Sequence, residues 1–381
     1  MPEFPYDRLS RSPDVEAPNL QAHDATDPLL VERGIELAAE RGLTGSQLAV
    51  IGDGYGAITL ALLDAGFDGV RVHQDLATGR RALARNALAL GLAGFVPHEL
   101  DDALLTGVRL VLLQLPKALA ELEEIADAVA RWAADDVVLV AGGRVKHMTL
   151  AQNEVLAGSF AQVQPQRAQR KSRLIVAAHP RPVPEHPPYP VRHEHPDFGL
   201  ALVAHGGAFA GARIDIGTRV LLDVLAERSP QETSGTRNRT VVDLGCGTGA
   251  LAAAWALAHP DDRVIATDRS AAAAASARKT MNANGLGDRV AVVHDDAASE
   301  IPDATADVVL LNPPFHLGTS VHTAAASRLF EAAARILRPG GELWTVYNSS
   351  LGYRGELTRL IGPSRQVRRT PKFTVTRSVR R

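Results

Sequence analysis

The hydrophobic residues of this chain occur in short runs, and longer segments with apolar residues at helical spacing separate these runs. Strands that alternate with helices predict right-handed crossovers and an α/β fold, with a mainly parallel sheet covered on both faces. In the second half the expected strands are Thr240–Leu244, Arg263–Asp268, 289–294, 307–311, 342–347, 366–370 and Phe373–Val379, the last two as a hairpin. The expected helices there are Ala250–Ala258, 269–284, 320–337 and 352–361.

The first half repeats this order of elements. Its expected strands are Leu48–Ile51, 70–75, 109–113 and 137–140, with a helix at 78–90 and a hairpin at the end of the half. Asp75 lies 193 residues before Asp268, and the glycine-rich turns of the two halves have the same separation. The segment VLLQLPK lies 198 residues before VLLNPPF. A repeat of this kind predicts two similar α/β halves.

A proline-rich segment separates the halves. It runs from His179 to Pro196 and contains seven prolines, which exclude a helix and a central strand there. We therefore expect a first domain at 1–180, a linker at 181–198 with short extended pieces, and a second domain at 199–381.

The length and composition agree with two ordinary globular domains. The chain has 381 residues, of which 45% are hydrophobic and 22% charged, and these values exclude a disordered chain, a collagen and a disulfide scaffold. The single cysteine, Cys246, fits a reducing compartment. No apolar run is long enough to span a bilayer, the N-terminal segment does not have the pattern of a signal peptide, and the histidines fit no zinc spacing. We expect a cytoplasmic protein without a membrane span or a metal.

The first chemical motif is the turn DLGCGTG, from Asp243 to Gly249, which follows the strand Thr240–Leu244. Its glycines allow the backbone to approach a ligand closely between a strand and a helix. The turn has neither the Gly-Lys-Ser/Thr of a P-loop nor the third glycine of a dinucleotide fingerprint. Asp243 has the position to accept from a ligand ammonium or from backbone amides. The alternative is a tight turn without a ligand.

Acidic residues follow the next two strands. Asp268 comes nineteen residues after Gly249, where a carboxylate can bind ribose hydroxyls or cap the following helix. These two roles are compatible. Asp295 and Asp296 follow the third strand, where one carboxylate can meet an adenine amino group. The alternative for this pair is a solvated loop.

The most specific motif is Asn312-Pro313-Pro314-Phe315, after the fourth strand. The two prolines fix the backbone and remove two N–H donors. Asn312 offers an acceptor and a donor pair, and Phe315 offers a stacking face. Together they suit a flat heteroaromatic ring that carries an exocyclic amine. The alternative is a rigid loop after a buried strand.

These motifs, in this order, resemble class I S-adenosylmethionine-dependent methyltransferases that act on planar amino groups. With GAFAGARIDIGTRVLL at 207–222 and PKFTVTRSV at the end, the chain is similar to the ribosomal RNA guanine-N2 methyltransferases. LQAHDATDPLL at 20–30 and LLQLPKALAELE at 112–123 resemble the large-subunit members more than the small-subunit ones. The resemblance implies two tandem Rossmann-like methyltransferase domains, each a mainly parallel seven-stranded sheet with helices on both faces, the first degenerate and the second active.

The resemblance also implies roles for matching residues. The methionine part of S-adenosylmethionine would be held by Asp243, Gly245, Gly247 and Gly249. The ribose would be bound by Asp268, and the adenine would lie near Asp295 or Asp296. The guanine 2-amino group would be bound at Asn312 and the Pro313 carbonyl, with Pro314 and Phe315 beside the base. The cofactor would be covered by Asp215 and Phe209.

The first half departs from this pattern at four positions. Where the second half has Asp243, Asn312, Pro313 and Phe315, the first has Val50, Gln114, Leu115 and Lys117. It keeps Gly52, Gly54, Gly56 and Asp75. We expect this half neither to bind cofactor nor to transfer methyl groups, and to bind RNA instead.

The net charge of −2 hides two basic segments. Residues 155–184 contain five cationic residues and no acid, at Arg167, Arg170, Lys171, Arg173 and Arg181. The stretch from Arg365 to Arg381 contains seven cationic residues and no acid. Such segments predict an electrostatic footprint for ribosomal RNA phosphates. The alternative is an ordinary solvated run of charge.

We therefore expect methyl transfer to the N2 amine of a guanine in ribosomal RNA, with 23S RNA favoured. A 16S RNA substrate is one alternative, and adenine-N6 or protein-glutamine methylation is another, because similar sites serve those groups. An RNA-binding factor without activity is the alternative outside enzymes.

Overall fold

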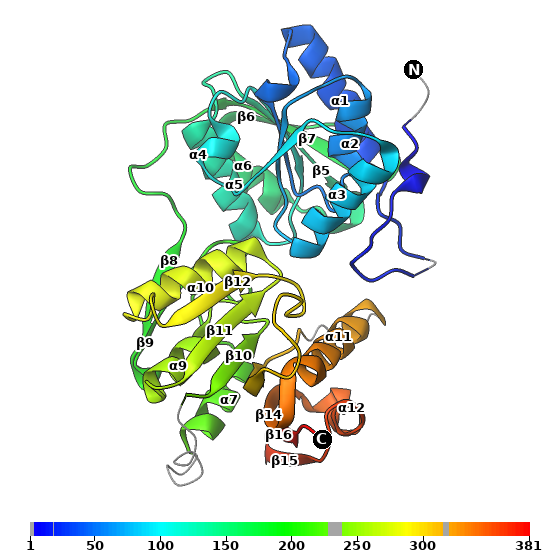
Figure 1. The fold of residues 1–381 in the computed structure, drawn as a ribbon. Coiled ribbons are helices and arrows are strands. Elements are labelled where there is room, and N and C mark those ends of the chain that lie inside the picture. The colour runs from blue at the N-terminus through cyan, green and yellow to red at the C-terminus, as the bar shows by residue number, and fades with distance from the viewer. Residues whose placement is uncertain (1–3, 18, 228–237, 315–319) are drawn as a thin grey trace. The chain divides into compact units, whose positions relative to one another are not determined.

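The computed structural model describes residues 4–17, 19–227, 238–314 and 320–381. The chain divides into two compact units, Met1–Tyr189 and Pro190–Arg381. Each unit has its own sheet and its own hydrophobic clusters, so each is described separately (Figure 1).

The second unit contains a seven-stranded sheet in the order β12-β11-β10-β13-β14-β16-β15. All pairs are parallel except those of β16, which runs antiparallel to β14 and β15. The strands are β10 Thr240–Leu244, β11 Arg263–Asp268, β12 Val290–His294, β13 Ala306–Leu311, β14 Leu337–Asn348, β15 Ser364–Arg369 and β16 Phe373–Val379. The expected mainly parallel α/β sheet is confirmed, including its final hairpin.

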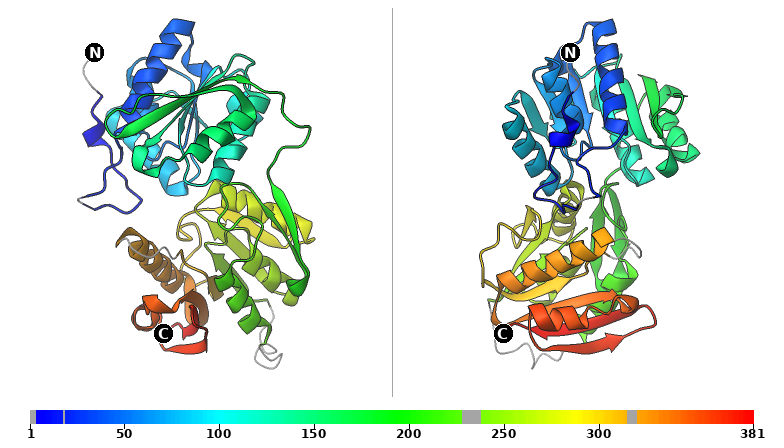
Figure 2. Two further views of the ribbon diagram at one scale, coloured as in Figure 1. Left: turned by 180° about the vertical axis from the view of Figure 1, so that it is seen from behind. Right: turned by 90° about the vertical axis from the view of Figure 1, so that its right-hand side faces the viewer.

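Helices cover both faces of this sheet (Figure 2). One face carries α7 Ile216–Ala226, α9 Ala250–Ala258 and α10 Ala271–Ala283, and the other carries α11 Ser320–Ile336 and α12 Arg354–Leu360. Successive strand residues serve opposite faces: Val241 packs with the first group of helices and Val242 with the second. This double coverage explains why the central strands read as continuous apolar runs.

A two-stranded ribbon opens the second unit. It consists of β8 Val191–His195 and β9 Leu200–Ala204, which pair antiparallel. Polar side chains of α10 hold β9, since Asn284 bonds to the backbone of Ala201 and Thr280 to that of Val203. Within the segment expected as a linker with short extended pieces at 181–198, Val191–His195 forms the first strand of this ribbon.

The first unit has the same sheet order, β3-β2-β1-β4-β5-β7-β6, with β7 antiparallel to both neighbours. The strands are β1 Leu48–Ile51, β2 Val70–His73, β3 Phe95–His98, β4 Leu110–Gln114, β5 Val138–Arg144, β6 Phe160–Pro165 and β7 Ser172–Pro180. The helices on one face are α1 Thr26–Arg41, α2 Ala57–Asp64 and α3 Ala77–Leu90. Those on the other are α4 Asp102–Leu105, α5 Leu119–Trp132 and α6 Leu150–Ser159.

Short 3-10 turns complete the described chain. They are Tyr6–Arg8, Gly45–Gln47, Val145–His147, Pro196–Phe198 and Ser349–Leu351. In the part of the chain described above, no helix combines the length and the apolar character that a membrane crossing requires.

The main departure from the expected elements is in β14. The segment Arg338-Pro339-Gly340-Gly341, expected to end a helix and precede the strand, lies inside this strand. Its pairing with β13 shifts register between Ala306 and Val308, so the strand absorbs an irregular stretch. The turn residues keep a local irregularity, with Gly340 at a φ of 81°, while Leu337 and Glu342 on either side pair with β13.

Candidate functional site

The expected site residues gather at one edge of the second sheet, where the strands end. The chain leaves β10 toward β11 and β12 on one side and reaches β13 and β14 on the other, so the order reverses between β10 and β13. Crevices at such reversal points are the usual ligand sites of open α/β sheets. Leu244 pairs with Leu311, and consequently Gly245 and Asn312 follow adjacent strand positions.

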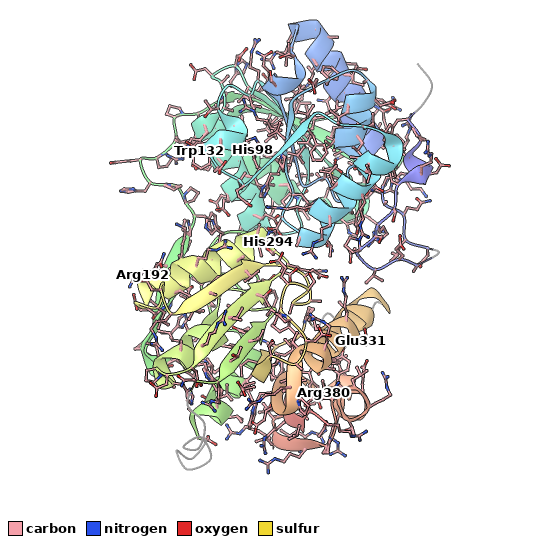
Figure 3. The ribbon with its side chains drawn as sticks, viewed as in Figure 1. His98, Trp132, Arg192, His294, Glu331 and Arg380 are labelled. Carbon is pink, nitrogen blue, oxygen red and sulfur yellow. The ribbon has the colours of Figure 1, made fainter. Side chains whose placement is uncertain are left out.

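The other two strand ends extend the same edge. Asp268 ends β11 and pairs with His294, the last residue of β12, which is labelled in Figure 3. The backbone amide of Asp295 donates to the carbonyl of Asp268 at 2.9 Å. Asp268, at the end of β11, and Asp295, just after β12, are therefore neighbours in space.

The glycine-rich turn has left-handed backbone at Gly245, Gly247 and Gly249, with φ of 73°, 55° and 81°. A Cβ atom at Gly245 or Gly247 would meet no atom within 4 Å, whereas one at Gly249 would lie 2.7 Å from Cε of Met281. The first two glycines thus leave open space beside the turn. The third permits close packing of the turn against α10.

Asp243 is buried and ties β10 to α9. Its Oδ2 accepts from the backbone amide of Ala252 at 2.9 Å. Burial raises the pKa of this carboxyl to about 7, and the negative charge of Asp268 adds to the shift. We expected Asp243 to accept from backbone amides or from a ligand ammonium. The described contact is with a backbone amide, that of Ala252.

Asp268 holds the glycine-rich turn by its side chain. Its Oδ2 accepts from the amide of Gly247 and its Oδ1 from that of Ser270, both at 2.9 Å. The N-cap of α10 is Ser270, whose Oγ accepts from the amide of Ala273. The capping role considered for Asp268 therefore belongs to Ser270.

Asp295 and Asp296 are both buried, so a solvated loop is the wrong description of this pair. The carboxylate of Asp295 accepts from Oγ of Ser299 and from the amide of Glu300, and this organises the turn after β12. Asp296 forms an ion pair with Arg328 of α11. The sequence alone gave no signal for Arg328, because its contact depends on how α11 packs.

Asn312 is held by the N-terminus of α7. Its Nδ2 donates to Oδ2 of Asp215 at 3.1 Å and to Oγ1 of Thr218 at 2.9 Å. The other oxygen of Asp215 accepts from the amides of Gly217 and Thr218, so this residue is also the N-cap of α7. The Oδ1 atom of Asn312 is buried and has no hydrogen-bond partner among the described residues.

The contact of Asp215 with Asn312 is an addition to its expected role, in which Asp215 helps to cover the cofactor. Thr218 was missed, although Asp-x-Gly-Thr before an apolar run is a recognisable helix start. Phe209, the other residue expected to cover the cofactor, precedes α7 with 63% of its surface exposed.

The remaining motif residues lie directly after β13. Pro313 is buried and Pro314 is exposed. Phe315, expected to stack on the substrate base, lies outside the described residues. Among the described residues, no group of three or more acidic, histidine or cysteine side chains is placed to hold a metal ion.

The first unit keeps related contacts at the matching strand ends. Gln114 ends β4, and its Nε2 donates to Oδ1 of Asp27 near the start of α1, as Asn312 does to Asp215. Asp53, in the glycine-rich turn, accepts from the amides of Gly56 and Thr59. Burial raises the pKa of Asp27 to about 7, with Asp53 contributing.

The glycine-rich turn of the first unit is also covered by the beginning of the chain. The guanidinium of Arg11 lies 4.5 Å from the ring centroid of Tyr55, and the Tyr55 hydroxyl donates to Asp14 at 2.9 Å. Asn86 of α3 bonds to the backbone of Ser10 in both directions. Residues from the first segment thus pack on Tyr55, whereas a Cβ atom at Gly54 would meet no atom within 4 Å, as at Gly247 in the second unit.

Two family models match the chain. A model described as RLMG N-terminal domain matches residues 3–181, and one described as Methyltransferase small domain matches residues 199–377. A protein of Streptomyces avermitilis named ribosomal RNA large subunit methyltransferase G is 36% identical, covering 98% of this chain and 97% of its own. The chain belongs to the ribosomal RNA large subunit methyltransferase G family. A Pseudomonas paraeruginosa protein of this family is also 36% identical and covers 96% of each chain.

A solved structure supports the fold of this family member over nearly its whole length. The T. thermophilus 16S rRNA N2 G1207 methyltransferase, solved in complex with AdoMet and guanosine, aligns with a TM-score of 0.70. The alignment covers 88% of each chain at 24% identity. The tandem arrangement of two Rossmann-like units is therefore shared with a solved protein of low sequence similarity.

Two glycine substitutions should distinguish the glycine of the turn that is closely packed from the one that faces open space. Gly247→Ala is expected to cost about 1 kcal/mol, because alanine tolerates left-handed backbone poorly but meets no atom there. Gly249→Ala is expected to cost a further 1–3 kcal/mol or so, because the new methyl group collides with Met281. Hydrogen exchange of the α9 and α10 amides measures both effects within the second unit. Equal destabilisation by the two variants would contradict the assignment.

Proposed function

We propose that this chain transfers a methyl group from S-adenosylmethionine to the exocyclic N2 amine of a guanine in ribosomal RNA, with 23S RNA favoured. The observation that carries the proposal is the buried Oδ1 of Asn312, an acceptor without a partner among the described residues, beside an open glycine-rich turn. Relatives named as large-subunit ribosomal RNA methyltransferases favour 23S over 16S RNA.

The residues at the strand ends fit this cofactor. Open space at Gly245 and Gly247 lets a ligand approach the turn where a side chain would obstruct it. Asp243, Gly245, Gly247 and Gly249 would hold the methionine part. Asp268 would bind the ribose hydroxyls while its backbone contacts keep the turn in place. Asp295 or Asp296 would lie near the adenine, and their carboxylates also hold the turn after β12 and Arg328.

The chemistry requires positioning more than acid or base catalysis. S-adenosylmethionine, when bound, supplies a methyl group that its sulfonium already activates. The guanine 2-amino nitrogen is a poor nucleophile, since its lone pair is delocalised into the ring. In the proposal Oδ1 of Asn312 and the carbonyl of Pro313 each accept one N–H of this amine. These bonds favour tetrahedral nitrogen and stabilise the positive charge that develops on it.

The geometry also bears on the form of the substrate. A recessed acceptor cannot reach the N2 of a guanine inside a helix, so the target base would be unpaired or flipped out. Pro314 and Phe315 would lie beside this base, and Phe209 would help to cover the cofactor. The proton of the product would leave to water, without a general base.

The basic segments would supply part of the RNA contact, although several of their cations already have partners. Arg368 pairs with Glu227, Arg377 with Glu342 and Arg170 with Glu32. The exposed cations of these segments that form no ion pair with a described residue are Arg365, Arg369, Lys372 and Arg381 in the second unit and Arg167, Lys171 and Arg181 in the first. We propose that these make the phosphate contacts.

The first unit would serve RNA binding alone. Its departures at Val50, Gln114, Leu115 and Lys117, together with the packing on Tyr55, argue against cofactor binding there. In this proposal the region 1–180 positions RNA and the region 199–381 carries out the reaction. The reducing compartment suggested by a single cysteine agrees with a cytoplasmic site of action.

A substrate panel tests the proposed reaction. Tritiated cofactor is offered with 23S RNA, 16S RNA, DNA and release-factor protein, and label is expected in 23S RNA at guanine N2. Asn312→Ala should abolish transfer while cofactor affinity stays nearly intact, because the acceptor for the amine is lost. Asn282→Ala, at an exposed position of α10, is the matched control and should be fully active. Label in DNA or protein alone would refute the assignment.

Cofactor binding should release a proton at mildly acid pH. The Asp243 carboxyl, with a pKa of about 7, is largely protonated at pH 6 in the free protein. A cationic ligand favours the charged form, so binding lowers this pKa, releases up to about one proton, and tightens as pH rises toward 7. Calorimetry at pH 6 in buffers of different ionisation enthalpy measures this. Asp243→Asn should abolish the release, and exposed Asp288→Asn should not.

The same calorimetry gives the binding stoichiometry. We expect one cofactor per chain, and two per chain would contradict an inactive first unit.

Removal of cations from the C-terminal segment should weaken RNA binding in a salt-dependent way. The triple variant Arg365→Ala, Arg369→Ala, Lys372→Ala is expected to flatten the plot of log affinity against log salt by about two units, since each lost phosphate contact removes roughly 0.7–0.9. Arg263→Ala, an exposed cation at the start of β11, is the control. An unchanged slope would show that these charges face solvent only.

A further inference from the structure

Every N–H of the Asn312 side chain is used by the N-terminus of α7. One bond goes to the carboxylate of Asp215 and the other to the hydroxyl of Thr218. That hydroxyl in turn donates to Oδ2 of Asp215 and therefore presents its lone pairs to Asn312. Three side chains thus form a closed set of donors and acceptors.

This set fixes which way the amide points. A carboxylate accepts and does not donate, so the nitrogen of Asn312 must face Asp215. The oxygen then faces away from α7, buried and without a partner among the described residues. Leaving such an acceptor unsatisfied is unfavourable, and an incoming N–H would satisfy it. The side-chain oxygen of Asn312 is thereby held as an acceptor for an N–H group of a ligand.

The carboxylate itself cannot easily rotate. Its Oδ1 accepts from the backbone amide of Gly217 at 2.8 Å and from that of Thr218 at 3.3 Å. These two bonds satisfy backbone amides that have no partner within the helix. Asp215 is consequently anchored to the helix through one oxygen and orients Asn312 through the other.

We propose that Thr218, with Asp215, is a positioning residue for methyl transfer: the pair locks the Asn312 amide with its oxygen toward the substrate amine. This inference rests on the proposed function of Asn312. Neither residue touches the reacting atoms. Their effect is on the fraction of molecules in which the amide is ready to accept, and it should therefore act on kcat rather than on cofactor affinity.

The first unit shows which part of this arrangement is specific to the second. Gln114 donates to Asp27 there, so the contact between carboxylate and amide is common to both sheets. Asp27 is the second residue of α1, whereas Asp215 is the N-cap of α7 and Thr218 lies in the first turn of that helix. A role in folding would account for the contact that the two sheets share. Among the described contacts, a hydroxyl accepts the second N–H at Asn312, whereas the amide of Gln114 donates to the carboxylate of Asp27 alone.

The decisive variant is Thr218→Val in the full-length protein, which keeps the shape of the side chain and removes the hydroxyl. We expect kcat to fall about 10- to 100-fold, as the amide gains a second orientation, with cofactor Kd unchanged. Thr218→Ser restores the hydroxyl and should recover most of the loss. Thr358→Val, which removes the hydroxyl of a helical threonine in α12, is the matched control and should keep full kcat. Full kcat in Thr218→Val, or no recovery in Thr218→Ser, would overturn the inference.

A second measurement does not depend on activity. The Asn312 side-chain N–H resonances, assigned by their disappearance in Asn312→Ala, should exchange slowly with solvent in the free protein and quickly in Thr218→Val. Slow exchange with no methylation of any RNA would refute the proposed function and leave the lock in place. Fast exchange in the unsubstituted protein would refute the lock itself.

Discussion

The second unit depends on a carboxylate placed between a helix and a strand that are far apart in sequence. Asp215 precedes α7, Asn312 follows β13, and 97 residues separate them. A carboxylate at a helix N-terminus is stabilised by free amides, and it keeps one oxygen for another partner. This second oxygen accepts from Asn312 and so links the end of β13 to the N-terminus of α7. The helix which closes one face of the sheet therefore also orients the motif at its edge.

Other carboxylates along this edge of the sheet also link separate segments of the chain. Asp268 accepts from the turn after β10 and from the residue that caps α10, so one side chain fixes two connections. Asp243 joins β10 to α9, and Asp295 organises the turn after β12. In each case a carboxylate at a strand end satisfies backbone amides that would otherwise be orphaned. These bonds hold the described strand ends in place, which suits a reaction that relies on positioning.

Much of this architecture was predictable from the sequence. Periodicity and the 193-residue repeat predicted two α/β units. The order of the motifs, each after a strand, predicted that the site residues lie at one edge of the second sheet. What the sequence could not supply were contacts set by packing. Arg328 meets Asp296 because of how α11 lies, and Thr218 meets Asn312 because α7 packs on β14 and β16, next to β13 in the sheet. The extent of β14 was not predicted because Leu337, before the turn residues, pairs with Ala306 of a strand that precedes it by a whole helix.

The turn of the first unit bears on how such sequences should be compared. Val50 stands where the second unit has Asp243, but Asp53, three residues later, reaches the third helical amide that Asp243 reaches from the strand. The carboxylate has moved along the chain while its partner has stayed in place. An alignment column would score a lost residue where the physical bond persists. A buried carboxylate between the first strand and its helix is thus a property of the α/β turn, and its presence alone does not identify a methyl donor site.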